Sequence, residues 1–268
     1  MQNKRRLLNF LILLLVGHVS FGQVLEVGVG VGGAGYMGDL NQKQPFKISG
    51  ISAGGYFKMN LDPYWSLGLN YTYGKIKADD AKSDNAQYRD RNINFNTSLN
   101  EVNLNLEFNF FDYFAGGGTK KFTPYIFTGI GAVLYNPKAK YDGTEYKLRF
   151  YKTEGQSEPY KNYAFNIPYG AGLKVRLKEN WGFFSQIGYR TAFSDYLDDI
   201  SGRYPNASSW PKDDSPEIRT IRQKLSDPSL TQYGSPGVQR GDFRKRDTYM
   251  FVGVGISYTF VSQKCYTF

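Results

Sequence analysis

Residues 102–110, VNLNLEFNF, alternate strictly between apolar and polar side chains. Val, Leu and Phe occupy the even positions of this stretch, and Asn and Glu occupy the odd positions. Side chains of a β-strand point alternately to its two faces, so the stretch predicts a strand with one apolar and one polar face. A tilted strand of about ten residues is also long enough to cross a membrane.

Seven further stretches of the chain show the same alternation. They lie at 24–36, about 48–60, 65–75, about 123–135, 165–176, 181–191 and 249–260. The composition agrees with a β-rich chain, because aromatic residues make up 17% of it and 30 residues are Gly. Aromatic girdles and tight turns are typical of membrane-spanning strands. After the first 22 residues, no stretch approaches the roughly 20 consecutive apolar residues of a membrane-spanning helix.

The connections between these stretches alternate in length. Three are short, around 61–63, 111–121 and 178–180, whereas four are longer, at roughly 37–47, 76–98, 137–162 and 193–247. Short turns at one end and long loops at the other predict an all-β fold, an eight-stranded antiparallel transmembrane β-barrel. The short turns and both termini then face the periplasm, and the long loops face outside. A soluble β-sandwich is the alternative, but its turns would not sort by length and its strands would average five or six residues.

The N-terminus predicts a secretory signal peptide at residues 1–22. Lys4, Arg5 and Arg6 precede an apolar run at 7–16, and the cleavage point falls before Gln23. The predicted mature chain, 23–268, is one barrel domain. Its net charge falls from +9 to about +6 once three basic residues are removed.

Loss of the signal peptide also removes His18, the sole histidine of the chain. Ser-His-Asp and Cys-His catalysis, HExxH sites and His-ligated zinc all require an imidazole, so these classes are excluded for the mature chain. Cys265 is the sole cysteine and cannot form an internal disulfide. We therefore expect no enzyme, no cofactor and no metal. A carboxylate- or Lys-based enzyme is the remaining catalytic alternative.

Five charged residues have the strand parity of the barrel interior. They are Glu26, Lys58, Glu107, Lys174 and Arg176. An eight-stranded barrel is only wide enough inside for its own side chains, and unpaired charges there would be costly. We predict that these residues form a plug of ion pairs toward the periplasmic end. A proton or ion path is the alternative, and a water-filled diffusion pore is not expected.

Two groups of loop carboxylates have the residue type that binds Ca²⁺. They are Asp195, Asp198 and Asp199, and Asp79, Asp80 and Asp84. Neither has the spacing of a DxDxDG loop, so we expect solvated carboxylates in both.

The sequence RGDFRKR at 240–246 resembles an integrin-type motif or a basic nucleic-acid patch. We instead expect it to form the polar edge of the barrel, with no nucleic-acid partner. In the same loop, Ser215 and Pro216 predict a short helix that runs to about Leu225.

The end of the last predicted strand has a pattern of its own. Gly255, Tyr258 and Phe260 fit a Gly-x-x-apolar-x-aromatic ending, which resembles the recognition signal of the barrel-assembly machinery. We expect that machinery to be a partner during biogenesis.

Several segments, in order along the chain, resemble the PorG-like outer-membrane barrels of Bacteroidota. They are 36–41 (YMGDLN), 124–127 (PYIF), 135–141 (YNPKAKY), 153–156 (TEGQ), 194–202 (SDYLDDISG) and 239–242 (QRGD). The resemblance implies an integral outer-membrane barrel with a role in type IX secretion, a system that also serves gliding motility.

The resemblance further implies two protein partners and no catalytic motif. The partners are a periplasmic ring lipoprotein (PorK/GldK-like) and its own partner (PorN/GldN-like), and outer-membrane lipid surrounds the barrel. The barrel would anchor this ring through its periplasmic turns, whose expected contact residues are Asp62, Pro63, Lys120, Lys121, Lys178, Glu179 and Asn180. The alternative is an OmpA- or OmpX-like surface barrel for adhesion or envelope integrity.

Overall fold

The computed structural model describes residues 24–113, 119–178, 180–231, 233–242 and 244–261. The predicted signal peptide, His18, Glu179 and Cys265 lie outside these ranges. In the described ranges, eight strands form the barrel wall: β1 (Val24–Met37), β2 (Ile48–Asn60), β3 (Trp65–Asp79), β4 (Asn94–Asn109), β5 (Phe122–Tyr141), β7 (Tyr163–Lys178), β8 (Trp181–Ala192) and β9 (Thr248–Phe260).

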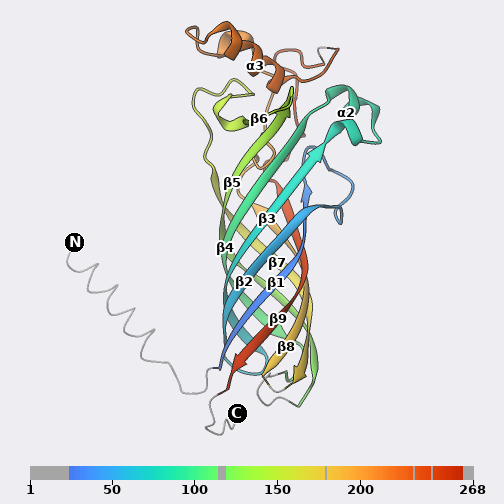
Figure 1. The fold of residues 1–268 in the computed structure, drawn as a ribbon, viewed down its shortest axis with the longest axis vertical. Helices are drawn as coiled ribbons and strands as arrows, with labels where there is room; N and C mark the ends of the chain where they lie inside the picture. Colours follow the sequence, from blue (N-terminus) through green and yellow to red (C-terminus); the bar gives the residue numbers. More distant parts are fainter. Residues whose placement is uncertain (1–23, 114–118, 179, 232, 243, 262–268) are drawn as a thin grey trace, which may run out of the picture.

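The eight strands close into an antiparallel barrel, as the alternation predicts (Figure 1). Each strand pairs with its neighbours in chain order, and β1 closes the wall by pairing with β9 from Leu25↔Phe260 to Met37↔Thr248. β6 (Thr144–Lys147) is not part of the wall, because it pairs only with the end of β5 as a hairpin. Closure removes the open sheet edges that could not exist in lipid.

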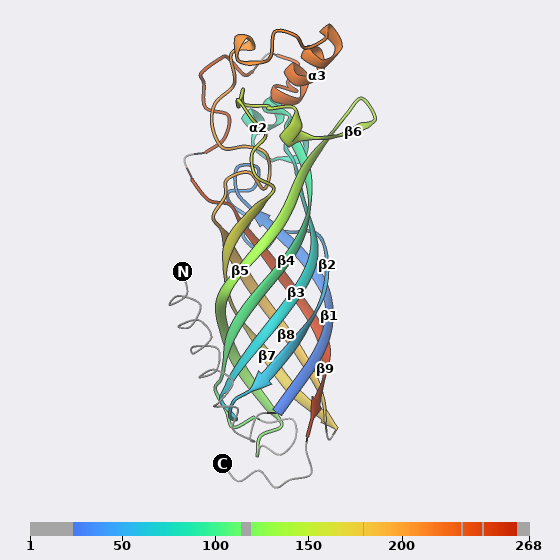
Figure 2. The ribbon, with the colours of Figure 1, turned by 90° about the vertical axis from the view of Figure 1, so that its left-hand side faces the viewer.

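The two ends of the barrel differ in size. The long loops gather at the end where β6, α2 (Ala86–Arg91) and α3 (Pro216–Ser226) lie, and the short turns lie at the other end, where the chain enters β1 and leaves β9 (Figure 2). Ser215 caps α3 by accepting a hydrogen bond from Ile218 N at 3.3 Å, which confirms the predicted helix. Within the described ranges, no helix is both long and apolar enough to cross a membrane.

The outward face of the strands carries an exposed apolar belt. Its members are Val29, Val31, Ile51, Leu69, Val102, Leu104, Ile126, Ile130, Leu134, Phe165, Ile167, Leu173, Val254 and Ile256. Aromatic residues border the belt toward the short turns, where Trp65 packs on Phe108 and Trp181 on Tyr258. Tyr71, Tyr73 and Tyr163 lie toward the other end. An apolar wall between two aromatic girdles is the surface that a lipid bilayer covers.

Within the belt the apolar side chains of the strands face outward, whereas nearer the long loops the apolar side chains face inward. In β4 the outward residues Val102 and Leu104 are apolar, but nearer the long loops the inward Phe95 and Leu99 are apolar and buried. The predicted strands at 102–110 and 123–135 were therefore too short, because β4 begins at Asn94 and β5 ends at Tyr141. The strands continue beyond the bilayer around a packed core.

The described residues of the long loops pack together over this core. We call the described residues of 38–47, 80–93, 142–162 and 193–247 the extracellular cap. A buried cluster beneath and within it joins the upper barrel to the loops: Ala34, Tyr36, Ile76, Phe95, Leu99, Val133, Tyr135, Ala139, Leu148, Ala164, Ala192, Leu197, Leu225, Tyr249 and Phe251. Residues from the loops, such as Leu197 and Leu225, thus complete a core that the strands begin.

Candidate functional site

The half of the lumen near the short turns is filled by two acidic and two basic side chains. Lys58 Nζ lies 2.8 Å from Glu107 Oε2 and 3.5 Å from Glu26 Oε1. Lys174 Nζ lies 2.7 Å from the same Glu107 oxygen. All four are buried, so the group is a balanced ion-pair plug that spans β1, β2, β4 and β7.

Arg176, the fifth predicted member of the plug, lies nearer the end of β7. Its position in the strand has the same parity as that of Lys174, and it is half-buried rather than buried. Its backbone N–H donates to Lys121 O at 2.7 Å, so Arg176 borders the short turn between β4 and β5. It therefore lies at the mouth of the lumen, beside the plug.

A second polar layer crosses the lumen closer to the cap. Glu101 accepts hydrogen bonds from Arg190 Nε at 3.2 Å and Asn103 Nδ2 at 2.6 Å, and also from the hydroxyl of Tyr249. Asn166 Nδ2 donates to Tyr249 Oη at 2.5 Å. The strand predicted to begin at 102 left Glu101 out, although Glu101 and Glu107 share one parity.

Little free space lies between these two layers. A cavity lined by Tyr56, Phe184, Gln186 and Arg190, among others, has a volume of about 50 Å³. Such a volume admits a few waters, not a solute. Two layers of paired charges with aromatic rings beside them make the described lumen a packed core without a passage for a solute.

Three of the residues expected to contact a periplasmic partner make hydrogen bonds within the chain. Asp62 Oδ1 accepts from the backbone N–H of Tyr64 and Trp65 in its own turn, both at 2.7 Å. The carbonyl of Asn180 accepts from Thr259 N on β9 at 2.9 Å. The carbonyl of half-buried Pro63 accepts from Asn109 Nδ2 on β4 at 3.0 Å.

Three lysines project from the same end of the barrel. Lys120, Lys121 and Lys178 are exposed, and none forms an ion pair with another residue of the described ranges. They lie on two neighbouring turns, because Lys121 O accepts from Arg176 N near the end of β7. The short-turn end therefore presents a small basic surface.

At the opposite end, two buried arginines join the loops of the cap. Arg91 donates to Asp80 at 2.6 and 3.0 Å, to Arg240 O at 3.0 Å and to Asp39 O at 3.3 Å. One side chain thus holds three separate loops together.

Arg240 makes an equally dense set of bonds. Its guanidinium donates to Asp199 O at 2.7 Å and to Ser226 O at 3.2 Å, and it lies 3.4 Å from Glu154 Oε1. Asp199 also accepts from Thr153 Oγ1 at 2.5 Å. Four of the segments that carry the sequence resemblance, 36–41, 153–156, 194–202 and 239–242, therefore meet inside the cap.

These contacts correct expectations about two groups of loop carboxylates. Asp198 and Asp199 are fully buried and Asp80 is 1% exposed, so they are not solvated carboxylates. In the stretch at 240–246, Arg240 is also buried, at 2% exposed, whereas Arg244 and Arg246 are exposed just before β9, as expected of the polar edge of the barrel. Burial in each case comes from other loops, which local spacing does not reveal.

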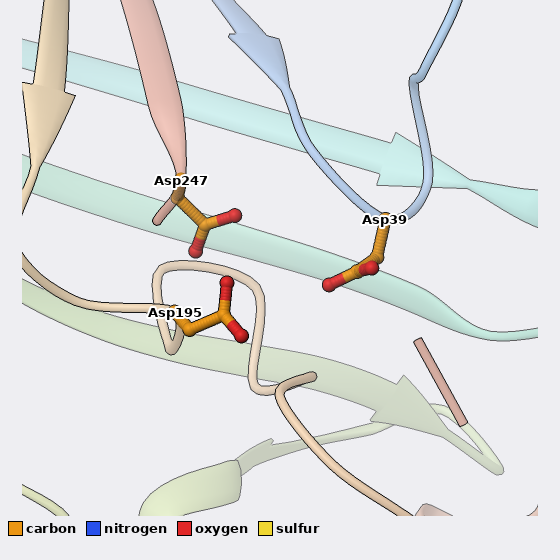
Figure 3. Close-up of side chains that lie close together, drawn as sticks. All are labelled: Asp39, Asp195 and Asp247. Carbon is orange, nitrogen blue, oxygen red and sulfur yellow. The ribbon is translucent and has the colours of Figure 1, made fainter. Parts of the chain in front are cut away.

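Three carboxylates, one from the loop 38–47 and two from the ends of the loop 193–247, point toward one another in the cap (Figure 3). Asp39, Asp195 and Asp247 each offer an oxygen within 4.8 Å of the others. Burial raises the pKa of Asp39 to about 7 and that of Asp195 to about 6. Burial and then the neighbouring carboxylates raise the pKa of Asp247 well above its usual range.

The ligand type of this carboxylate group suits a hard divalent cation. The raised pKa values mean that the group is partly protonated near neutral pH. Its three members lie at 39, 195 and 247, so no local spacing in the sequence could reveal the group.

The residues of the predicted assembly signal lie on both faces of β9. Tyr258 and Phe260 face outward with ring centroids 5.1 Å apart. Gly255 faces inward, where an added Cβ would lie 2.3 Å from the Phe184 ring and 2.3 Å from Val29 O. A side chain at position 255 would therefore disturb the lumen packing.

The chain belongs to the family described as a domain of unknown function, DUF6089, whose family model matches residues 5–212. No curated protein matches it in sequence.

The fold of the chain is similar to those of several solved structures, of which three are described below. The N-terminal barrel domain of Pseudomonas aeruginosa OprF is 12% identical, over 89% of this chain and 98% of that chain, with a TM-score of 0.39. OprG from the same organism is 13% identical, over 90% and 97%, with a TM-score of 0.39. A major outer membrane protein of Thermus thermophilus is 10% identical, over 89% and 99%, with a TM-score of 0.44.

Proposed function

We propose that this member of the DUF6089 family is a non-enzymatic scaffold in the outer membrane that anchors the periplasmic ring of the type IX secretion and gliding machinery. The observation that carries the scaffold role is the filled lumen. Glu107 pairs with Lys58 and Lys174 across the barrel, and Glu101 with Arg190 in a second layer. A barrel without a passage acts through its two ends.

The ring-anchoring role rests on the sequence resemblance and on the short-turn end. Lys120, Lys121 and Lys178 are exposed there and suit an acidic surface of a PorK/GldK-like lipoprotein or its PorN/GldN-like partner. Asp62 and Asn180 lie on the same turns, and their hydrogen bonds with Tyr64, Trp65 and Thr259 hold the backbone beside this surface. Rim charges of this kind speed encounter and fix orientation.

A surface barrel for adhesion or envelope integrity is the second candidate. The cap favours it, because Arg91 and Arg240 fix the long loops into one ordered extracellular surface. In that case the cap, not the short turns, would carry the partner.

A pull-down from native outer membranes in mild detergent separates the two candidates. The tagged full-length protein would be compared with Lys120→Glu, Lys121→Glu, Lys178→Glu as one triple variant. The matched control is Lys212→Glu with Lys224→Glu, two exposed lysines of the cap. The anchor role predicts recovery of the lipoprotein and its partner with the wild type and the control, and their loss from the triple variant.

Two results would overturn the anchor role. One is a barrel recovered alone. The other is recovery with surface components only, lost from the cap control, which would support the second candidate.

A further inference from the structure

The outer wall of the barrel turns basic directly above the apolar belt. On β3, exposed Tyr73 is followed on the same face by Lys75 and Lys77, both exposed. On β5, Leu134 is 55% exposed and Lys138 lies four residues further on, again on the same face. Lys75 is therefore only about 7 Å along the strand from the last outward aromatic ring on β3.

Cations also stand at this level on the other sides of the barrel. Lys47 directly precedes β2 and is exposed. Lys161 Nζ lies 5.6 Å from the ring centroid of Tyr163, an exposed residue at the start of β7. The guanidinium of Arg246 lies 4.3 Å from the ring centroid of Phe193, which follows β8.

These cations form one band, which we call the basic rim. Its members are Lys47, Lys75, Lys77, Lys138, Lys161 and Arg246. They belong to strands or strand ends distributed around the wall, from β2 and β3 through β5 and β7 to β9. The band therefore follows the extracellular edge of the belt rather than one loop.

Few acidic groups of the described ranges neutralise this band. Lys138 Nζ pairs with Glu145 Oε2 at 2.8 Å. Hydrogen bonds from Lys138 and Asn96 lower the pKa of Glu145, and the nearby charges of Lys138 and Lys75 lower it further. Lys47, Lys77, Lys161 and Arg246 form no ion pair with a residue that the structure describes. An excess of positive charge thus remains at the level where lipid headgroups begin.

We infer that the basic rim is a binding site for the phosphate groups of an anionic glycolipid of the lipid A type in the outer leaflet. The belt places the acyl chains below the rim, so the first polar groups of the same lipid lie beside these cations. Lysine stems can lie on apolar surface while their ammonium groups reach headgroup phosphates. Cations at a membrane surface gain energy from anionic headgroups, and the gain depends on salt.

The test measures lipid binding to the purified full-length protein in micelles by native mass spectrometry. The probes are bisphosphorylated lipid A, the same lipid without phosphates, and inorganic phosphate. The rim variant carries Lys47→Gln, Lys77→Gln and Lys161→Gln. The control carries Lys212→Gln, Arg219→Gln and Lys224→Gln, three exposed cations of the cap in or beside α3.

We expect the wild type and the control to bind bisphosphorylated lipid A equally. The rim variant should bind it about 100-fold more weakly, because it lacks three lysines near the lipid phosphates. Removing the phosphates should weaken wild-type binding to a similar extent. Equal binding of both lipid forms, or equal binding by the rim variant and the control, would overturn the inference.

Two further binding measurements use the wild type alone and do not depend on how the variant folds. Raising the salt from about 0.05 to about 0.5 M should weaken lipid A binding, because the rim is exposed to solvent. A salt-independent affinity would contradict a phosphate site. If inorganic phosphate at millimolar concentration displaced the lipid completely, the rim would bind free phosphate rather than the lipid. The secretion partner plays no part in these measurements.

Discussion

Glu107 is the residue that balances the lumen. Its Oε2 lies 2.8 Å from Lys58 Nζ and 2.7 Å from Lys174 Nζ, and all three side chains are buried. Replacing it with Gln would leave two buried ammonium groups with only Glu26 to balance them. The loss of one partner from a buried ion pair costs far more than the pair itself contributes.

We therefore expect Glu107→Gln to lower the free energy of unfolding by about 3 kcal/mol or more, measured as a urea midpoint in micelles. Glu145→Gln is the matched control, because it removes the exposed partner of Lys138 and should cost less than about 1 kcal/mol. Adding Lys174→Met to Glu107→Gln restores the charge balance and should recover part of the loss. Equal midpoints for the two single variants would contradict the plug.

The stability of the cap depends on pH because of its buried carboxylates. The pKa of folded Asp39 is about 7 and that of Asp195 about 6, against about 3.9 in an unfolded chain. Between these values the folded state binds more protons, so stability is present at low pH and is lost as pH rises through 6 to 7. Asp242, Arg91 and Arg244 face the same groups.

Hydrogen exchange of the cap, corrected for the intrinsic rate, should accordingly report stronger protection at pH 5 than at pH 8. Asp39→Asn removes one titrating group but keeps an oxygen that can accept from Asp242 N. The variant should show a smaller difference between the two pH values. Protection that rises with pH in the wild type would have the opposite sign and would refute this account.

For single residues, the sequence predicted the positions that the alternation of side chains along a strand determines. The inward positions of Glu26, Lys58, Glu107 and Lys174 follow from alternation alone. The burial of Arg240 does not, because it depends on contacts with residues 14 to 87 positions away. Tertiary contacts of that kind leave no local pattern.

Strands β4 and β5 show why the bounds of elements were harder to predict than their existence. Within the belt, the outward residues of β4 are apolar, and above it the inward ones are, so the pattern shifts by one residue between Leu99 and Val102. Read as hydrophobicity alone, the shift looks like the end of a strand. It instead marks the level where lipid gives way to water around the wall.

In the final strand, β9, Gly255 is required for packing in the lumen, whereas Phe260 is expected to act in recognition by the assembly machinery. Gly255→Val would place methyl groups against the Phe184 ring and Val29 O, so refolding into liposomes should fail. Phe260 is 51% exposed on the outer face, so Phe260→Ala should refold in liposomes but accumulate poorly in outer membranes of cells. The two yields measured side by side test this. Normal accumulation of Phe260→Ala in cells would remove the assembly signal from this ending.

The whole molecule is a closed wall with two different ends. The cap buries its charged residues in a network centred on Arg91 and Arg240, whereas the short-turn end exposes Lys120, Lys121 and Lys178. Sequence reasoning identified both ends from loop lengths. It could not foresee that the long loops would fold into one unit, because their contacts cross between four loops.

Site-specific photo-crosslinking in cells tests the anchoring claim most directly. A photoreactive residue would replace Lys121 or Lys178 at the short turns, and Lys212 or Lys224 in the cap as matched exposed positions. A ring anchor should give adducts with the PorK/GldK-like lipoprotein or its partner from the two turn positions and none from the cap. Adducts with those proteins from the cap positions alone, or none from any position while the ring is assembled, would contradict it.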